Sequence, residues 1–473
     1  MSMNDLNGVA LSTPHPLARD AWDRATMLFH GYYGDPLAAI DEALQAHPDF
    51  AMGHVLKAGV VLTTTDVRLY PLAAEALASA RRHAGPRDVR AQGHLAAAGA
   101  WLEGDLQRAV DLYGAVLAAF PRDAFALQLA HLGDYLLGDA NALRERPATT
   151  LAHWDRDAPA YGYMLGMHAF GLEESGDFER AEAVGREALE RNRRDPWAIH
   201  AVAHVFEMQG RLDEGIDWLE RRRDDWVPDN GFAFHNAWHL ALYWLELDQH
   251  DKVLSLYDEL VRPAANDVVY ELIDASALLW RLHLRGVDVG RRWQDVSAQW
   301  RGRVGDRLNV FNDLHALLAL LACGELAGAR ALLADLEASP RGSGRHAAPA
   351  WHAAIDVARG LLAFAERRDA EALPHLMRGH ERAVAFGGSA AQRDLVALTA
   401  LECARRADAA GIALDLVQRR LDLRPNSPFA WAALAEWRAR HADETTARNA
   451  RNQATQSRRE WLRRIADRSP MAA

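Results

Sequence analysis

Cysteine and lysine are almost absent from this sequence. Its 473 residues include two cysteines, Cys323 and Cys403, and lysine occurs only at Lys57 and Lys252. Two cysteines cannot build a multi-disulfide framework or a cysteine-based zinc site, and they fit a reducing cytoplasm. Basic residues are outnumbered overall. The net charge is −11 and the pI about 6.0, so no nucleic-acid partner is expected.

Long apolar runs are also missing. The longest, such as LHALLALLAC at 314–323, are too short to cross a bilayer, so no membrane partner is expected. Residues 1–22 lack a basic segment followed by an apolar core, so we expect no signal peptide and a cytoplasmic location. No alternation of apolar and polar residues persists long enough to predict a β-sheet.

The sequence does contain a recurring helical pattern. Segments GDLQRAVDLYGAVL, GDFERAEAVGREAL and GRLDEGIDWLERR begin at Gly104, Gly176 and Gly210. Each glycine follows a segment in which apolar and polar residues recur with helical spacing, and the glycine is expected to end that helix. A small residue five positions after each glycine allows the next helix to pack closely. The resulting helix-turn-helix unit of roughly 34 residues has the tetratricopeptide period.

Weaker copies of this unit predict one fold for the chain: all-α, an α-α superhelix of about twelve tetratricopeptide-like hairpins. The joins carry Pro and Asp or Ser, as in PRD at 121–123, RDP at 194–196 and RPNSP at 424–428. NALRERPATT (141–150) and ASPRGSGRHAAP (338–349) are expected to be loops inside one solenoid.

We divide the chain into four regions on this basis. They are an N-terminal extension (1–19), less regular helical repeats (20–150), central tetratricopeptide repeats with a groove lined by His and acidic residues (151–341), and C-terminal helical repeats with the turn GGSAAQRDL (342–473).

Two neighbouring predicted helices each carry a pair of histidines. His200 and His204 lie in PWAIHAVAHVFEMQG, and His235 and His239 lie in FAFHNAWHLALYWLELD. Positions i and i+4 share one face of a helix, so each pair projects as a unit. Consecutive helices can therefore aim both pairs at one volume.

Tetratricopeptide numbering places more side chains on the same inner face. With Gly210 as repeat position 15, His200, His204 and Glu207 fall at positions 5, 9 and 12, which typically face the groove. The other candidates on first helices are Trp197, Trp238, Asp274, Asp313 and His315.

Several runs of the sequence carry a family resemblance. They are MHAFGLEE (167–174), DPWAIHAVAHVFEMQGRLDEG (195–215), HNAWH (235–239), YD (257–258) and GGSAAQRDL (387–395). In order and spacing, the chain resembles the tetratricopeptide repeat protein 38 family over most of its length. The resemblance implies an all-helical repeat fold, and it supplies no established catalytic residues.

The turn GGSAAQRDL also has a local interpretation. Its two glycines end a helix, and Ser389 with Gln392 forms a capping box for the next one. Capping does not explain Arg393 and Asp394. A helix N-terminus with an arginine can bind an anion, so Ser389, Arg393 and Asp394 are candidate ligand-binding residues.

The histidines admit a metal or an acid–base role. HxxxH is a zinc spacing, but Ala201 stands where the zincin motif needs Glu. His200 and Glu207 are about 10 Å apart along an ideal helix, so one ion needs histidines of both helices. Imidazole titrates near neutrality, and Glu207 or Asp274 could orient it. No GxSxG, P-loop or activated cysteine is present.

The favoured interpretation is a cytoplasmic repeat protein that binds a peptide or small polar ligand in its concave groove without a cofactor. The alternative is a hydrolytic or proton-transfer enzyme acting on a small molecule in the same pocket. Its catalytic candidates are the four histidines, Glu207 and Asp274, with zinc as the cofactor that the histidines could hold. An open groove favours binding and a closed, convergent pocket favours catalysis. A homodimer through one end of the solenoid is a further expectation.

Overall fold

The computed structural model describes residues 3–338 and 347–468, and these form an all-α superhelix, as predicted. Successive helices pack as hairpins, and the described residues contain twelve of them. The first six are α1 (Pro16–Gly31) with α2 (Pro36–Ala46), α3 (Ala51–Thr63) with α4 (Tyr70–His83), α5 (Val89–Leu102) with α6 (Leu106–Ala119), α7 (Ala124–Leu137) with α8 (Ala140–Leu151), α9 (Tyr161–Glu174) with α10 (Phe178–Arg191), and α11 (Pro196–Met208) with α12 (Leu212–Arg221).

The second six complete the superhelix. They are α14 (Ala233–Glu246) with α15 (His250–Leu256), α16 (Val269–Leu284) with α17 (Arg292–Arg301), α18 (Val310–Ala322) with α19 (Leu326–Ala338), α20 (Ala347–Ala365) with α21 (Asp369–Glu381), α22 (Ala390–Arg406) with α23 (Ala410–Leu423), and α24 (Pro428–Arg440) with α25 (Glu444–Arg468). Shorter elements are β1 (Met3–Asn4), β2 (Ala10–Leu11), α13 (Arg223–Trp226), η1 (Val67–Leu69), η2 (Tyr257–Val261) and η3 (Ala383–Phe386).

Glycine and aspartate define the hairpin boundaries. Gly104, Gly176 and Gly210 have φ values of +82°, +79° and +66°, a conformation that is easy only for glycine. At the other end of the repeat, the carboxylates of Asp123 and Asp195 accept backbone N–H groups in the first turns of α7 and α11. The helix ends and starts predicted from the sequence are therefore confirmed at these positions.

One predicted loop is wrong. NALRERPATT (141–150) lies within α8, which continues through Pro147. Proline has no N–H, so the carbonyl of Leu143 loses its helical donor. Gly171 of α9 lies against that carbonyl, since a Cβ built on it would come within 2.1 Å of the oxygen. Tight packing of α9 against α8 thus maintains a helix that the sequence pattern argued against. The other predicted loop, ASPRGSGRHAAP, and the 341/342 boundary fall mainly at 339–346, outside the described residues.

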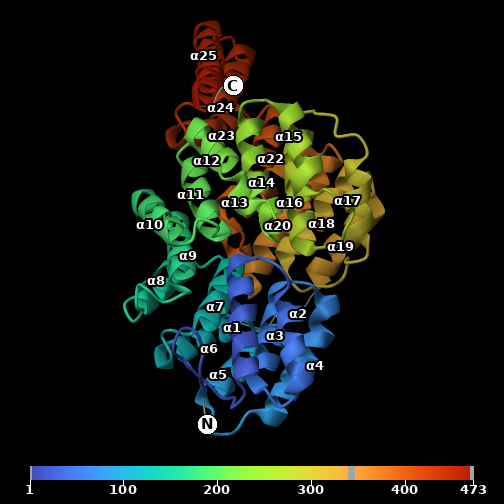
Figure 1. Cartoon of the computed structure of the whole chain (residues 1–473). Coiled ribbons are helices and arrows are strands. Elements are labelled where there is room, and N and C mark those ends of the chain that lie inside the picture. The colour runs from blue at the N-terminus through green and yellow to red at the C-terminus, as the bar shows by residue number, and fades with distance from the viewer. Residues whose placement is uncertain (1–2, 339–346, 469–473) are drawn as a thin grey trace.

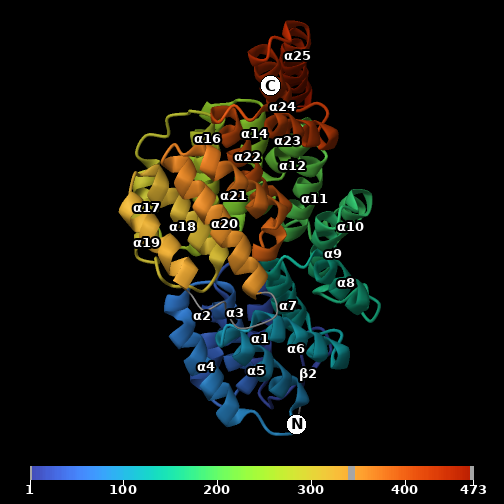
Figure 2. The same cartoon turned by 180° about the vertical axis from the view of Figure 1, so that it is seen from behind.

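The superhelix curls so that distant hairpins meet. The helices α1–α7 form one end of the molecule, and α24 and α25 project from the other (Figure 1). From behind, α20 and α21 cover the middle of the molecule (Figure 2). Helix α22 packs against α11 and α16, which are far away in sequence. Tyr135 of α7 donates a hydrogen bond to the Gln392 side chain at 2.5 Å, and Arg281 donates to the Ala391 carbonyl at 2.7 Å.

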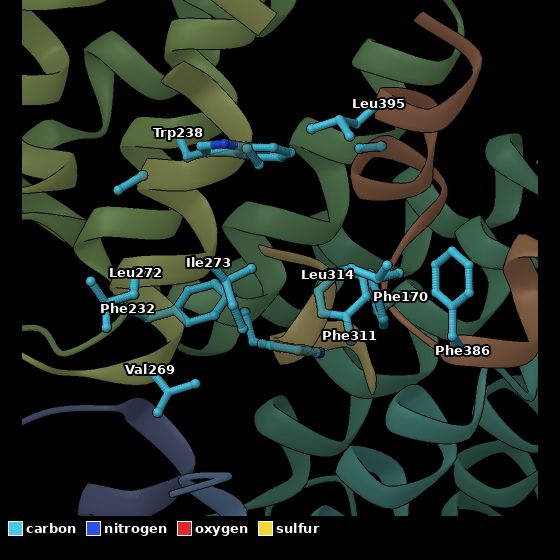
Figure 3. Packing of buried hydrophobic residues seen from close by; sticks show 14 of the residues in the cluster. Phe170, Phe232, Trp238, Val269, Leu272, Ile273, Phe311, Leu314, Phe386 and Leu395 are labelled. Carbon is cyan, nitrogen blue, oxygen red and sulfur yellow. The ribbon is translucent and has the colours of Figure 1, made fainter. Parts of the chain in front are cut away.

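Apolar side chains from many hairpins share one core. Phe170 of α9, Phe311 of α18 and Phe386 of η3 come together beside the turn that precedes α22, and Trp238 of α14 extends toward Leu395 of α22 (Figure 3). Within the described residues, no helix combines the length and the apolar character that crossing a membrane requires.

Candidate functional site

Helices α11 and α14 bring four imidazoles to one place. His200 and His204 come from α11, and His235 and His239 come from α14. Ring centroids are 4.4 Å apart for His200 and His204, 4.3 Å for His204 and His239, and 4.8 Å for His200 and His235. One ring nitrogen from each residue can be chosen so that all four lie within 4.8 Å of one another. We call this set the four-histidine cluster.

Carboxylates bind the outward nitrogens of the cluster. The Nδ1 of His239 lies 2.8 Å from Oε2 of Glu207, and the Nδ1 of His235 lies 2.6 Å from Oδ2 of Asp274. The Nδ1 of His204 lies 3.3 Å from Oε2 of Glu173, but the two groups do not form a hydrogen bond. A carboxylate on Nδ1 fixes the orientation of the ring and increases the basicity of Nε2.

The inward nitrogens have no protein partner. Among the described residues, Nε2 of His239 and both ring nitrogens of His200 and of His204 make no hydrogen bond. Buried polar groups are nearly always paired, so a cluster of unpaired imidazole nitrogens around a common centre needs an explanation.

Burial favours the neutral form of His200, His204 and His239. Desolvation lowers the pKa of His200 and of His239 well below the ordinary value, and it lowers the pKa of His204 to about 4 although Glu174 opposes the change. The expectation that these imidazoles titrate near neutrality is therefore wrong for the three residues. Neutral imidazole is the form that binds metal ions.

The cluster does not face an open groove. His204 and His239 are completely buried, and His235, the most accessible of the four, is 8% exposed. The sequence left open whether these residues line an open groove or a closed pocket, and their burial matches the closed alternative. The superhelix is wound tightly enough for α22 to pack against α11 and α16 on the inner side.

Both candidate tryptophans form walls of the cluster. Trp197 is buried, with its ring centroid 5.2 Å from that of His200. Trp238 is completely buried and stacks on His235 at 5.5 Å with 7° between the ring planes. These contacts position imidazoles and exclude water, and neither ring is an exposed platform for a ligand.

Asp313 and His315 of α18 lie outside the four-histidine cluster. The His315 Nδ1 lies 2.7 Å from the Phe311 carbonyl of its own helix. Desolvation raises the pKa of Asp313 to about 7, and its Oδ2 has no hydrogen-bond partner among the described residues. The structure does not bring these two residues to the histidines.

The GGSAAQRDL turn is occupied by internal contacts. Ser389 and Gln392 form the predicted capping box of α22. Arg393 does bind a carboxylate, but it is Glu174 of this chain, at 3.2 Å. Asp394 pairs with Arg420 at 2.9 Å. None of the three candidates from this turn is left free for a ligand in this arrangement.

Sequence reasoning missed Glu173 and Glu174 at the end of α9. Glu173 is 2% exposed, neither of its oxygens has a hydrogen bond among the described residues, and burial raises its pKa well above the ordinary value. With Gly176 as repeat position 15, Glu173 falls at position 12, the same position as Glu207. The numbering that identified Glu207 could therefore have identified Glu173.

Comparisons with known proteins support only coarse statements. No protein-family model matches the chain. Cellulose synthase 2 operon protein C from Komagataeibacter xylinus is 32% identical over 184 residues, which are 36% of this chain and 14% of that protein. This chain thus spans 14% of the length of that curated relative.

Solved structures with weak similarity cover nearly the whole chain. Human IFIT1, solved as a dimer with PPP-AAAA, aligns over 92% of this chain and 88% of its own with a TM-score of 0.39 and 12% identity. The APC/C hetero-tetramer Cut9-Hcn1 aligns over 95% of this chain and 83% of that chain with a TM-score of 0.41 and 12% identity. Similarity this low does not determine a function.

Proposed function

We propose that this protein is a metal-binding helical-repeat protein, with one divalent transition metal ion held by the Nε2 atoms of the four-histidine cluster. The observation that carries the proposal is the pairing of carboxylates with Nδ1 of His239 and His235, while Nε2 of His239 and both ring nitrogens of His200 and His204 make no hydrogen bond among the described residues. A carboxylate–histidine–metal arrangement is the usual support of histidine ligands. All-imidazole donors suit zinc, copper, nickel and iron.

The expected metal is zinc, because it accepts neutral imidazole in any geometry the protein supplies. A closed site surrounded by aromatic side chains has no room for an extended peptide, so the ligand we propose is a small molecule. The resemblance to the tetratricopeptide repeat protein 38 family is proposed as true membership. Two free cysteines fit a cytoplasmic location, and a homodimer through one end of the solenoid remains a prediction that sedimentation can test.

A metal-dependent enzyme is the second candidate, and Glu173 favours it. Its carboxylate makes no hydrogen bond among the described residues and lies beside His204, and burial raises its pKa, as is common for carboxyl groups that transfer protons. Hydrolysis or proton transfer on a small polar molecule would fit such a pair. A Glu173→Gln variant that keeps its metal but loses turnover of a substrate would support this role.

Metal analysis of the purified protein tests the main proposal. Elemental mass spectrometry should find about one equivalent of transition metal per chain. His204→Ala and His239→Ala should each lose most of it, and His315→Ala, which removes a buried histidine outside the cluster, should keep it. Metal-free protein that binds neither zinc nor cobalt(II), or equal metal content in all three variants, would overturn the proposal.

Cobalt(II) gives a test that needs no variant. The visible absorption of the wild-type protein loaded with cobalt(II) reports nitrogen ligation and coordination geometry. Bands typical of imidazole ligands support the site, and the spectrum of aqueous cobalt(II) alone contradicts it.

A further inference from the structure

A polar cavity lies beside the four-histidine cluster. It has a volume of about 30 Å³ and is bordered by α11, α12, α14, α16, α22, α23 and the segment that joins α23 to α24. We call it the arginine pocket, and its main charged residues are Glu207, Glu246, Arg281, Asp394, Arg420 and Arg424. A space of this size is enough for a water molecule or two, or for a small ionic group.

Two of the acidic groups in the pocket are already paired. Arg420 binds Asp394 at 2.9 Å and Glu246 at 3.4 Å. Arg285, which also lines the pocket, binds Asp248 at 2.7 Å. Carboxylates of this chain therefore already bind the guanidinium groups of Arg420 and Arg285.

Arg281 and Arg424 have no such partner. No carboxylate of the described residues forms an ion pair with either guanidinium. Arg281 is 3% exposed and donates hydrogen bonds only to the carbonyls of Ala277 and Ala391 among the described residues. Arg424 approaches the Met208 sulfur at 3.9 Å. Desolvation lowers the pKa of Arg281 to about 10, although the nearby carboxylates of Asp394 and Glu207 oppose the change.

We propose that the arginine pocket binds the carboxylate group of a small organic acid through Arg281 and Arg424. A guanidinium presents a planar set of donors that matches the two oxygens of a carboxylate. The small volume favours a planar group over a tetrahedral phosphate ester with a bulky substituent.

Glu207 connects this pocket to the histidines. It lines the arginine pocket and also binds Nδ1 of His239 at 2.8 Å. An acid held by the arginines would therefore lie one side chain from the four-histidine cluster. The binding of a carboxylate by the arginine pocket does not depend on the proposed function. The further idea, that this acid is the small molecule on which the metal site acts, does rest on the proposed function.

Calorimetric titration of metal-free, full-length protein with acetate tests the binding step. Acetamide, which has the same shape without the charge, serves as the matched ligand, and chloride and phosphate are titrated at equal ionic strength. We expect one acetate per chain and no binding of acetamide. Equal heats for acetate and chloride, or tighter binding of phosphate than of acetate, would overturn the carboxylate assignment.

Variants locate the binding. Arg424→Gln should weaken acetate binding about ten-fold or more, because a hydrogen-bonded charge pair is lost. Arg424→Lys keeps the positive charge but lacks the planar guanidinium group, so its affinity for acetate should lie between that of Arg424→Gln and that of the wild type. Arg468→Gln, whose guanidinium binds Asp213 outside the pocket, is the control and should bind as wild type. Unchanged affinity in both Arg424 variants contradicts the proposal.

The two proposals fail separately in this design. Metal content of the Arg424 variants should equal that of the wild type, because Arg424 is not part of the four-histidine cluster. Acetate binding by a protein that takes up no metal would retain the arginine pocket and reject the metal site. Metal uptake by a protein that does not bind acetate would support the metal site and overturn the arginine pocket.

Discussion

At the scale of single residues, Glu207 matters most because it contacts both proposed sites. It binds His239 on one side and borders the arginine pocket on the other. Burial raises its pKa, and Arg424 and His204 oppose the rise. A carboxylate in this position can increase the basicity of an imidazole and also sense the charge of a neighbouring ligand.

Glu207→Gln should weaken metal binding without abolishing it. The amide keeps the size of the side chain but is a weaker acceptor for the His239 N–H, and loss of such an outer partner typically costs about 10- to 100-fold in metal affinity. Competition with a zinc chelator measures the change. Glu402→Gln, which alters a glutamate bound to Arg405 and Arg406, is the control. Equal affinity of the two variants would refute this role of Glu207.

Asp195 should make the stability of the protein dependent on pH. Burial raises its pKa to about 7, although the N–H groups of Trp197 and Ala198 oppose the change. A pKa that is raised in the folded state gives stability that is fully present below about pH 4 and lost as the pH rises through 7. Asparagine keeps the capping oxygen without the charge.

Asp195→Asn should therefore gain stability relative to wild type as the pH rises from 5 to 8, by ~2–4 kcal/mol. Urea unfolding at the two pH values measures the difference. The half-buried cap Asp105, changed to Asn, is the control and should show a much smaller dependence on pH. A wild-type advantage that grows toward pH 8 would have the wrong sign for this explanation.

At the scale of elements, the start of α22 matters most, because this helix fills the inner side of the superhelix. Its first turn is held by Ser389 and Gln392, and the Ala390 N–H donates to Glu174 of α9 at 2.9 Å. The cap therefore fixes a helix end and also the position of a carboxylate beside the four-histidine cluster.

Ser389→Ala should destabilise the protein by about 1 kcal/mol, the usual value of an N-cap, and should lower metal affinity less than Glu207→Gln does. Denaturant unfolding and chelator competition measure the two effects. Ser427→Ala at the cap of α24 is the matched control for stability, and it should leave metal affinity unchanged. A Ser389 variant as stable as the wild type would mean that the capping box contributes nothing.

At the scale of the whole molecule, contacts between distant repeats hold the superhelix closed. The end of α7 lies against η3 so closely that a Cβ on Gly138 would come within 2.0 Å of the Val384 carbonyl oxygen. Tyr270 of α16 donates to the Thr63 carbonyl of α3 at 2.9 Å, and Arg468 of α25 pairs with Asp213 of α12 at 2.8 Å. A solenoid stabilised only by neighbouring repeats would lack such contacts.

Gly138→Ala tests this closure. Gly138 and Gly286 have nearly equal φ values of +68° and +69°, but no atom lies within 4 Å of a Cβ built on Gly286. Gly286→Ala should cost about 1–2 kcal/mol from backbone strain alone, and Gly138→Ala should cost more because α7 and η3 must separate. Denaturant unfolding compares them. Equal losses of stability would show that the close approach is not important.

Much of the fold was predictable because its signals are local. Glycine turns at Gly104, Gly176 and Gly210 and aspartate caps at Asp123 and Asp195 depend on a few consecutive residues. The loop predicted at 141–150 was wrong because a contact with α9 compensates Pro147, and such compensation is not visible in the local sequence.

For the candidate site, the histidine pairs were predictable and their surroundings were not. Helical spacing places His200 with His204 and His235 with His239 on shared faces. The winding of the superhelix decides whether those faces are open or buried, and it brings Glu173 to one side of the histidines. Arg393 and Asp394 were expected to meet a ligand, but tertiary packing pairs them with Glu174 and Arg420.

The sequence by itself determined that this protein is a stack of helical hairpins and that two neighbouring inner helices each present a pair of imidazoles, because turns, caps and helical faces follow from residues close together in the chain. Only the tertiary structure decided that the four imidazoles are buried, that carboxylates bind two of them, and that two arginines without ion-pair partners lie nearby. The reason is that small rotations from one hairpin to the next add up along the chain, and their sum, which no local pattern records, brings α22 into the inner side of the curve.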